Sequence, residues 1–354
     1  MAHTVLITGA AGYVGFMLVE RLAKRADVAC VYALDKEEMP DTFASYPKIR
    51  YIQKNTSEDW ERDVDQIPDI IIHAAWQIRD LYGRYATQWK WNIEGSDRVF
   101  DFALRSAVRL IYFSTVASYG AYADNAIEQR FTERDLLRPS DYRYAEEKRI
   151  SELHLKEKYN TVAVEKRPAV CVVRPAAITG PQGRFARIRF GLQSALSGQL
   201  KGSFIYGIVS TLASFVPATP KWARQFVHED DVVDIIELLT FDKRVQGYEI
   251  FNLCPPGSPV LAADMARAVG KRIVRVHPQL VRLVFFVLHH ATLGKIPTAR
   301  GAWKGYSYPI LVVGNKITEQ LGYRYSASSA EAFMYTDGHY EVAVPKSVRR
   351  HKPL

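Results

Sequence analysis

The chain has 354 residues, of which 48% are hydrophobic and 24% charged, and its formal net charge is +9 at pH 7. These proportions are typical of a globular protein and exclude a disordered or fibrous chain. The length predicts two domains, or one large α/β domain with a smaller lobe. We find no apolar run long enough to cross a bilayer and no secretory leader, so we expect a cytoplasmic protein without an integral membrane span.

The net positive charge could attract nucleic acid, an anionic membrane or a phosphorylated metabolite. We expect a small-molecule substrate and no nucleic acid, because no basic stripe interleaved with aromatic residues is present. Three widely spaced cysteines indicate a reducing compartment and no metal centre. They are Cys30, Cys171 and Cys254. Residues 341–354 concentrate positive charge and are predicted to form a flexible basic tail.

The first half of the chain alternates apolar runs with amphipathic stretches. Thr4–Thr8 is a short β-branched run that is followed at once by glycines, and helical spacing begins at Phe16. A second helix is predicted over Asn92–Leu104. Further apolar strands are predicted at Cys30–Leu34, Tyr51–Ile52, Asp69–His73, Arg109–Phe113 and Val170–Val173. The pattern predicts an α/β fold, a Rossmann-type doubly wound parallel sheet over residues 1–174.

After Pro175 the alternation of apolar and amphipathic stretches becomes less regular. We predict that residues 175–340 mainly form a smaller C-terminal substrate-binding lobe. Part of this later chain is expected to return to the first domain. Pro309–Val313 is a candidate late strand. Leu280–Leu288 is the most apolar stretch of the chain. We interpret it as a core or subunit-interface helix in preference to a membrane-surface helix, because its polar face is thin and its charge is low.

Glycines follow the first strand in the segment TVLITGAAGYVG. Their G-x-x-G-x-x-G spacing suits a tight turn, close approach to a pyrophosphate and close helix–strand packing, with the helix N-terminus facing the phosphates. A plain turn between a strand and a helix is the alternative. The residues assigned to cofactor binding in this turn are Gly9, Ala11, Gly12, Tyr13, Val14 and Gly15.

Asp35 strengthens the cofactor interpretation, because it lies 20 residues after Gly15, at the end of the second predicted strand. A carboxylate there can accept hydrogen bonds from the adenosine ribose hydroxyls and would repel a 2′-phosphate, so NAD is favoured over NADP. Lys36, which we also assign to the cofactor, softens this preference.

Tyr144 and Lys148 stand four residues apart in YAEEK and share one face of a predicted helix. A nearby ammonium favours the phenolate and lowers the pKa of the tyrosine, so Tyr144 could exchange a proton with a substrate hydroxyl. The pair alone is common by chance, but here it follows strand Arg109–Phe113 and its STVASYG segment.

Several motifs come in one order: TGAAGYVG, Asp35, HAA, Asn92 with Gly95, STVASYG, YAEEK, VRPAAITGP and FVHEDD. Together they resemble the extended short-chain dehydrogenases/reductases, the NAD-dependent epimerase/dehydratase family, and in particular its sugar-nucleotide epimerases. The resemblance covers roughly residues 4–335.

The resemblance implies roles for individual residues. Tyr144 would be the catalytic acid/base, Lys148 would hold the nicotinamide ribose and tune the tyrosine, and the Thr115 hydroxyl would bind the reacting oxygen of the substrate. Further cofactor contacts would come from Asn55, Thr56, Ala74, Ala75, Asn92, Ser114 and Pro175. Relatives commonly pair through helices, so a homodimer is expected.

The departures from the family pattern narrow the chemistry. Val116 and Ala117 stand where sugar dehydratases and decarboxylases of the family carry acids, so elimination and decarboxylation are disfavoured. Ala177 and its neighbour Ala176 replace an asparagine that is common in nucleotide-sugar enzymes. Arg224 resembles an arginine that pairs with the pyrophosphate of the sugar nucleotide, and Arg184 could share that task.

The HEDD stretch at His228 suggests a metal ligand set at first sight, but adjacent residues rarely converge on one ion. We interpret it as a helix N-terminus, where acids suit the dipole, and we expect no metal.

The leading hypothesis is an NAD-dependent epimerase that acts on a nucleotide-diphosphate sugar through a transient keto intermediate. The alternative is a dehydrogenase or reductase of a larger apolar alcohol or ketone, steroid-like or isoprenoid-like. A non-catalytic NAD(H) binder is a third possibility.

Overall fold

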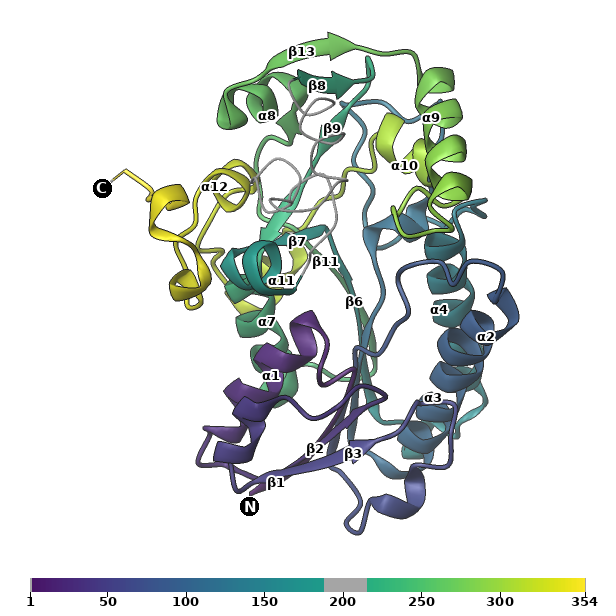
Figure 1. Ribbon diagram of the computed structural model, residues 1–354. Helices are drawn as coiled ribbons and strands as arrows, with labels where there is room; N and C mark the ends of the chain where they lie inside the picture. Colours follow the sequence, from purple (N-terminus) through teal and green to yellow (C-terminus); the bar gives the residue numbers. More distant parts are fainter. Residues whose placement is uncertain (1, 188–214, 354) are drawn as a thin grey trace. The chain divides into compact units, whose positions relative to one another are not determined.

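The chain forms two compact units, each built from several segments, in a computed structural model that describes residues 2–187 and 215–353 (Figure 1). The first unit comprises Met1–Thr115, Glu147–Arg174 and Val233–Phe251. The second comprises Val116–Glu146, Pro175–Val232 and Asn252–Leu354.

A seven-stranded sheet forms the centre of the first unit, in the order β11-β6-β5-β4-β1-β2-β3. Its strands are β1 (His3–Thr8), β2 (Val28–Asp35), β3 (Ile49–Gln53), β4 (Ile70–His73), β5 (Arg109–Phe113), β6 (Ala169–Pro175) and β11 (Tyr248–Leu253). From β3 to β6 all neighbours pair in parallel. The strand order reverses at β1, whose neighbours are β2 and β4, and ligands of such sheets bind where this happens. The predicted doubly wound α/β fold is confirmed.

Helices cover both faces of this sheet (Figure 1). On one face, α1 (Tyr13–Ala23) and α7 (Glu229–Phe241) are joined by Arg21, whose guanidinium lies 2.8 Å from the carboxylates of both Asp234 and Glu237. The other face carries α3 (Gly95–Ser106) and α4 (Arg143–Thr161). Helix α2 (Tyr85–Trp89) continues into α3 through a π-helical turn at Lys90–Glu94.

The apolar strands predicted from the sequence are buried because both sheet faces are covered. Leu6, Leu110 and Val172 lie in one core cluster with Phe100 and Leu155 from the helices α3 and α4. Each side chain of this size stabilises the fold by about 1.5–3 kcal/mol when it is fully buried. The carboxyl ends of the strands are thereby held rigidly, and the candidate site residues follow these ends.

The second unit is built from short paired strands and helices. Its strand pairs are β7 (Ala177–Thr179) with β10 (Phe226–His228), β9 (Ala223–Arg224) with β12 (Val260–Leu261), and β8 (Phe215–Ala218) with β13 (Arg272–Arg275). Among its described residues the unit has the helices α8 (Ala262–Val269), α9 (Pro278–Ala291), α10 (Ala302–Ser307), α11 (Lys316–Leu321) and α12 (Ser329–Met334). The core cluster includes Phe226 and Phe333, whose stacked rings are 4.9 Å apart.

The candidate strand Pro309–Val313 is not a strand, which corrects the prediction. Only Val312 forms a bridge, with Phe131. Side chains satisfy much of the backbone instead, because the Val312 N–H donates to Gln225 Oε1 at 2.7 Å and the Pro309 carbonyl accepts from Asn125 Nδ2 at 2.7 Å.

The apolar stretch at 280–288 is helical as predicted. Of the two interpretations given for it, the core helix is wrong, and the subunit-interface helix stays a prediction. Within α9 only Val281 and His289 are buried. Leu283 and Phe286 are 58% and 61% exposed. Of the described helices, none combines the length and the hydrophobicity that crossing a bilayer requires.

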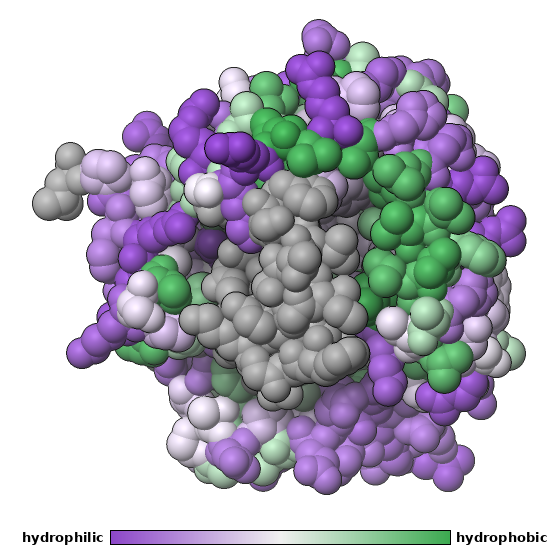
Figure 2. Space-filling view, turned by 45° about the horizontal axis from the view of Figure 1, so that its top comes forward, coloured by the Kyte–Doolittle hydropathy of each residue, from purple (hydrophilic) through white to green (hydrophobic). Residues whose placement is uncertain are grey.

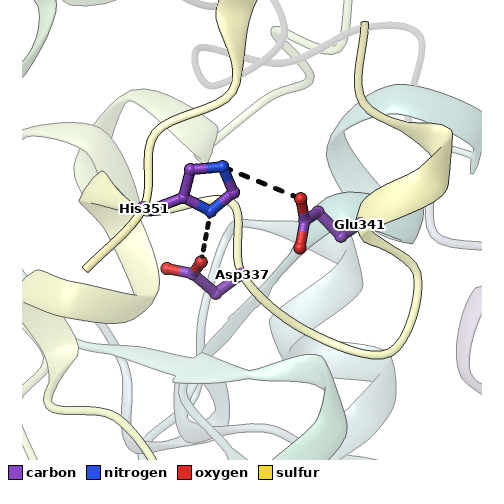
Figure 3. Close-up of side chains that lie close together, drawn as sticks. All are labelled: Asp337, Glu341 and His351. Carbon is purple, nitrogen blue, oxygen red and sulfur yellow. Dashed lines mark hydrogen bonds and ion pairs between the residues drawn. The ribbon is translucent and has the colours of Figure 1, made fainter. Parts of the chain in front are cut away.

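The basic tail is hydrogen-bonded to other residues of the second unit, which differs from the expected flexible end. Thr336 and Arg350 exchange backbone and side-chain hydrogen bonds, with the Arg350 N–H 2.8 Å from Thr336 Oγ1. His351 Nδ1 lies 2.7 Å from Asp337 Oδ1, and its Nε2 faces Glu341 (Figure 3).

Candidate active site

The glycine turn between β1 and α1 depends on missing side chains. Gly9 has a φ of +73°, and a Cβ there would lie 2.6 Å from the Ala75 backbone nitrogen. A Cβ at Gly15 would lie 2.0 Å from the Gly9 carbonyl oxygen, whereas one at Gly12 would lie 3.0 Å from it. Helix α1 begins at Tyr13, and its first turn carries no acidic side chain, so its N-terminus favours an anion.

Asp35 ends β2 and is tied directly to the glycine turn. Its Oδ2 accepts the Ala11 N–H at 2.9 Å, and its Oδ1 accepts the Glu37 N–H at 3.0 Å. A carboxylate oxygen can accept more than one hydrogen bond, so the group retains capacity for two ribose hydroxyls. Lys36 is exposed, pairs with Glu37 and lies 5.3 Å from the ring centre of Trp91.

Asn55 and Thr56 follow β3. The Asn55 side-chain oxygen accepts the Ser57 N–H at 3.0 Å, so it is partly used in its own turn. Thr56 is buried against the start of α3, where a Cβ at Gly95 would lie 2.4 Å from Thr56 Oγ1. This close approach explains why the Asn92–Gly95 motif needs glycine.

The segment after β4 is held against β1. The Ala74 N–H donates to the Thr8 carbonyl, and the Ala75 N–H donates to Thr8 Oγ1, both at 3.2 Å. His73 bridges Thr8 Oγ1 at 2.7 Å and Ser96 Oγ at 2.8 Å. Burial, helped by the charge of Lys148, holds the pKa of His73 well below its ordinary value. The imidazole is therefore a neutral structural link.

Asn92 lies in the π-helical turn and is buried. Its Oδ1 accepts the Gln77 N–H at 2.7 Å, and its Nδ2 donates to the Gln77 carbonyl at 3.0 Å and to Glu147 Oε2 at 2.7 Å. This amide therefore joins the segment after β4 to α4, one residue before Lys148.

Lys148 is a buried cation at the end of β5. Its ammonium donates to the Phe113 carbonyl and lies 3.7 Å from the ring centre of Trp76 and 4.9 Å from that of Tyr112. Desolvation lowers the pKa of Lys148 well below its ordinary value, and the charge of Glu152 opposes this shift. Sequence reasoning missed both aromatic neighbours, although Trp76 directly follows the HAA motif.

Ser114 and Thr115 follow β5 directly, and both are buried. The Ser114 N–H donates to the Val173 carbonyl of β6 at 2.8 Å. Within the described residues, the Ser114 hydroxyl has no hydrogen-bond partner. A buried polar atom without a partner is costly, so this hydroxyl fits a ligand that supplies one. Pro175 ends β6, the neighbouring strand.

Tyr144 lies in the first turn of α4, half-buried, with its ring centre 5.8 Å from that of Tyr142. Because α4 is continuous from Arg143 to Thr161, Tyr144 is one helical turn before Lys148 and on the same helical face. In the first unit, the structure places Lys148 against the strand that leads into Thr115.

The two arginines assigned to the substrate have different surroundings. Arg184 is buried and donates to the carbonyls of Phe333 at 2.9 Å and Ala332 at 3.0 Å, at the end of α12. Arg224 is half-buried, donates to the Ala223 and Gly305 carbonyls and lies 5.4 Å from the Trp222 ring centre. Burial lowers the pKa of Arg224 to about 10, so it stays charged at neutral pH.

The HEDD stretch opens α7, and its side chains serve local hydrogen bonds. Glu229 accepts the backbone N–H groups of Gln182 at 2.8 Å and Gly183 at 2.9 Å. Asp231 accepts the Tyr323 hydroxyl at 2.8 Å. These bonds fit the structural role that was expected of the stretch.

One group of three side chains in the described part of the chain has ligand atoms close enough to hold a metal: Asp337, Glu341 and His351 (Figure 3). Glu341 also faces Arg349 at 3.4 Å, and Asp337 accepts the Lys352 N–H at 2.7 Å. The group therefore anchors the basic tail.

Residues 5–254 match the model of the NAD dependent epimerase/dehydratase family. An uncharacterized protein of Methanocaldococcus jannaschii is 26% identical over 271 residues, 70% of this chain and 74% of that protein. A 3β-hydroxysteroid dehydrogenase/Δ5→4-isomerase of vaccinia virus is 27% identical over 190 residues. That match spans 51% of this chain and about half, 54%, of the viral enzyme.

Solved structures share the fold over nearly the whole chain. WbmG of Bordetella bronchiseptica, in complex with NAD and UDP, has a TM-score of 0.69 at 17% identity, over 97% of this chain and 94% of its own. The UDP-glucose 4-epimerase of Thermotoga maritima, with UDP-glucose, has a TM-score of 0.67 at 19% identity, over 94% and 97%. The dTDP-glucose 4,6-dehydratase of Bacillus anthracis, in complex with NAD, has a TM-score of 0.67 at 14% identity, over 95% of both chains.

Proposed function

The chain belongs to the NAD dependent epimerase/dehydratase family, and from that membership we propose that this NAD-dependent enzyme epimerises a nucleotide-diphosphate sugar through a transient keto intermediate. The observation that carries the proposal is the buried Lys148 ammonium, one helical turn from Tyr144 and at the end of the strand that leads to Thr115. This combination suits reversible oxidation of a substrate hydroxyl.

The residues of the first unit fit NAD. The Gly9–Gly15 turn and the acid-free first turn of α1 suit a pyrophosphate, and the Asp35 carboxylate suits a ribose diol. The partnerless hydroxyl of Ser114 suits a polar group of a ligand at the end of β5. When bound, NAD supplies a hydride acceptor that returns the hydride to the substrate later in the cycle.

The electrostatics of Lys148 support Tyr144 as the acid/base. Desolvation disfavours the buried Lys148 ammonium and lowers its pKa, and the charge of Glu152 compensates this only in part. Ionisation of the Tyr144 phenol would supply a further negative charge, so the two groups favour each other's charged forms. The phenolate takes the hydroxyl proton as the substrate carbon is oxidised and returns it when the carbon is reduced. We assign the Thr115 hydroxyl to the substrate oxygen.

Epimerisation is favoured over elimination by the residues that follow Thr115. Val116 and Ala117 have no group that could transfer a proton to a leaving hydroxyl. Loss of water from the sugar would need such an acid or base. The oxidised and reduced carbon is therefore expected to be the only centre that changes.

Arg224 supports a phosphorylated substrate, because a charged guanidinium suits a diphosphate in bidentate contact. The solved structures with UDP or UDP-glucose are consistent with this substrate class. Arg184 is left out of the substrate contacts, since its side chain binds the end of α12.

The second candidate function is a dehydrogenase or reductase of a larger apolar alcohol or ketone. The specific observations in its favour are the similarity to the viral hydroxysteroid enzyme and the replacement of the expected asparagine by Ala177. It differs from the first candidate in one measurable way, because oxidation would be net and NADH would accumulate.

The test is to incubate the protein with UDP-, GDP- and dTDP-sugars and to follow epimer formation by NMR together with absorbance of NADH. We expect an epimer to appear without net NADH. Tyr144→Phe should reduce turnover by about 100-fold to 10,000-fold, because it removes the acid/base. Tyr142→Phe, the neighbouring phenol, should retain turnover. Conversion of apolar alcohols with net NADH, and of no sugar nucleotide, would support the second candidate.

We also propose a cytoplasmic location and a homodimer. The free cysteines Cys30, Cys171 and Cys254 are consistent with a reducing compartment. Light scattering on the purified protein measures its mass directly, and a monomer at working concentration would exclude the dimer.

A further inference from the structure

The positive charge of the protein is concentrated around α9. Residues 265–318 contain no Asp or Glu. Their basic residues, nine in number and equal to the whole net charge of +9, are Arg267, Lys271, Arg272, Arg275, Arg282, Lys295, Arg300, Lys304 and Lys316. A segment this long without one acid has a strongly positive potential.

Helix α9 itself is apolar on two sides. Val281, Phe285 and His289 face inward, and Phe285 packs at 5.8 Å from the ring centre of Tyr306. The other side carries hydrophobic residues at positions i, i+3, i+4 and i+7, which share one helical face. They are Leu280, Leu283, Val284 and Val287, with exposed fractions of 51%, 58%, 42% and 53%.

Neighbouring side chains extend this exposed apolar face. Phe286 on α9 and Leu293 just after it are 61% and 64% exposed. Ile273 and Val274 of β13, ahead of α9, are also exposed. Figure 2 shows hydrophobic residues gathered on this face, with hydrophilic residues along its outer edge. A helix at a water-facing surface is normally polar on its outer side, and a contiguous apolar patch marks an interaction site.

The basic residues of the same segment are available to a ligand. Five of them are exposed and, within the described part of the chain, form no ion pair: Arg272, Arg275, Arg282, Lys295 and Arg300. They stand on β13, on α9 and in the turn that follows it. Exposed Leu, Val and Phe side chains with cations beside them, and no acids, match the acyl chains and anionic headgroups of a bilayer surface.

We propose that α9 and its basic flanks, residues 271–300, bind the surface of a membrane that contains anionic lipid, with the helix lying in the plane of the interface. The contact is peripheral, because no described helix could span a bilayer. The charge argues against a second copy of the chain on the same surface. In a symmetric dimer this acid-free segment would face itself, and the like charges would repel.

Vesicle flotation with the full chain tests this proposal. We expect binding to phosphatidylcholine vesicles that contain about one third phosphatidylserine to be at least about tenfold stronger than binding to phosphatidylcholine alone, and to weaken as salt is raised. Leu283→Glu with Val287→Glu should weaken binding to the anionic vesicles by at least about tenfold. The matched control is Leu136→Glu with Val342→Glu, at residues 86% and 84% exposed in the same unit, and it should bind like the wild type.

A second variant guards against misfolding of the first. Arg272→Gln with Arg275→Gln and Lys295→Gln keeps the apolar face and should lose most of the preference for anionic vesicles and most of the salt dependence. The proposal is overturned if the wild type binds neither vesicle. It is also overturned if the wild type forms a dimer that Leu283→Glu with Val287→Glu dissociates, without vesicle binding. None of these outcomes depends on the proposed reaction.

Discussion

Lys148 in the first unit and Arg184 in the second are both buried cations, but they have different partners. Lys148 donates to one carbonyl and lies over two aromatic rings, and desolvation lowers its pKa. Arg184 donates to three carbonyls at the end of α12. The lysine charge is thus available for a reacting group, whereas the arginine charge is used by the fold. A buried cation indicates a ligand site only when its own chain leaves it under-partnered.

Replacing Lys148 by Met should have the largest effect and separate activity from stability. Turnover should fall by at least about 100-fold, because the Tyr144 phenolate loses its neighbouring cation. The free energy of unfolding should rise by about 1–4 kcal/mol, because a poorly paired buried charge is removed. Lys158→Met, on the same helix and paired with Asp101, should change neither by much. Denaturant unfolding and steady-state kinetics measure the two effects.

The same variant has a pH signature. The folded-state pKa of Lys148 lies below its unfolded value, so the unfolded chain binds more protons between these two values. The wild type should therefore gain stability relative to Lys148→Met as pH rises toward about 10. If the variant instead gained stability relative to the wild type as pH rises, the Lys148 ammonium would be stabilising the fold.

Replacing Arg184 by Met should destabilise the protein by roughly 3 kcal/mol, since charge-assisted hydrogen bonds to buried carbonyls are lost. The KM for the sugar nucleotide should stay close to that of the wild type. Thermal or denaturant unfolding measures the loss. A raised KM in a fully stable variant would return Arg184 to the substrate site.

Arg224→Met should affect substrate binding more than stability, the opposite of what is expected for Arg184→Met. Loss of a guanidinium contact to a diphosphate should raise the KM for the sugar nucleotide by about tenfold or more, with a smaller change in stability. Steady-state kinetics with a UDP-sugar measures the KM. An unchanged KM would remove Arg224 from the substrate contacts.

The smallest effect is expected at the tail, for Asp337→Asn. Although burial opposes it, hydrogen bonds from His351 and Lys352 hold the pKa of Asp337 below its ordinary value. Its contribution to stability should therefore be present above about pH 4 and be lost as pH falls further. Because the carboxylate is partly exposed, the difference should stay below about 1 kcal/mol. Unfolding of the wild type and Asp337→Asn at neutral and acidic pH measures this difference in stability. A difference that persists at acidic pH would contradict a stabilising role of the ionised Asp337 carboxylate.

Much of the first unit could be predicted because its signals are local. Strands that are buried on both faces appear as continuous apolar runs, and the glycine turn requires small residues at fixed positions. The partners of Arg184 could not be predicted, since Phe333 lies 149 residues away along the chain. Val312 resembled a strand residue, but its backbone is satisfied by the side chain of Gln225.

The apolar helix α9 shows a second limit of sequence reasoning. Hydrophobicity at 280–288 predicts a helix that must be covered, but it does not say by what. A core helix and an interfacial helix can share the same composition, and only the exposure of residues such as Leu283 in the folded structure distinguishes them.

The most direct test of the proposed reaction is to identify the small molecules that freshly purified protein releases on denaturation, by mass spectrometry and absorbance. An epimerase regenerates its cofactor within each cycle and has no need to release it. We therefore predict that NAD(H) is retained in a stoichiometric amount, and that epimer formation needs no added cofactor. Cofactor-free protein whose activity depends on added NAD and accumulates NADH would contradict the proposal and establish a net dehydrogenase.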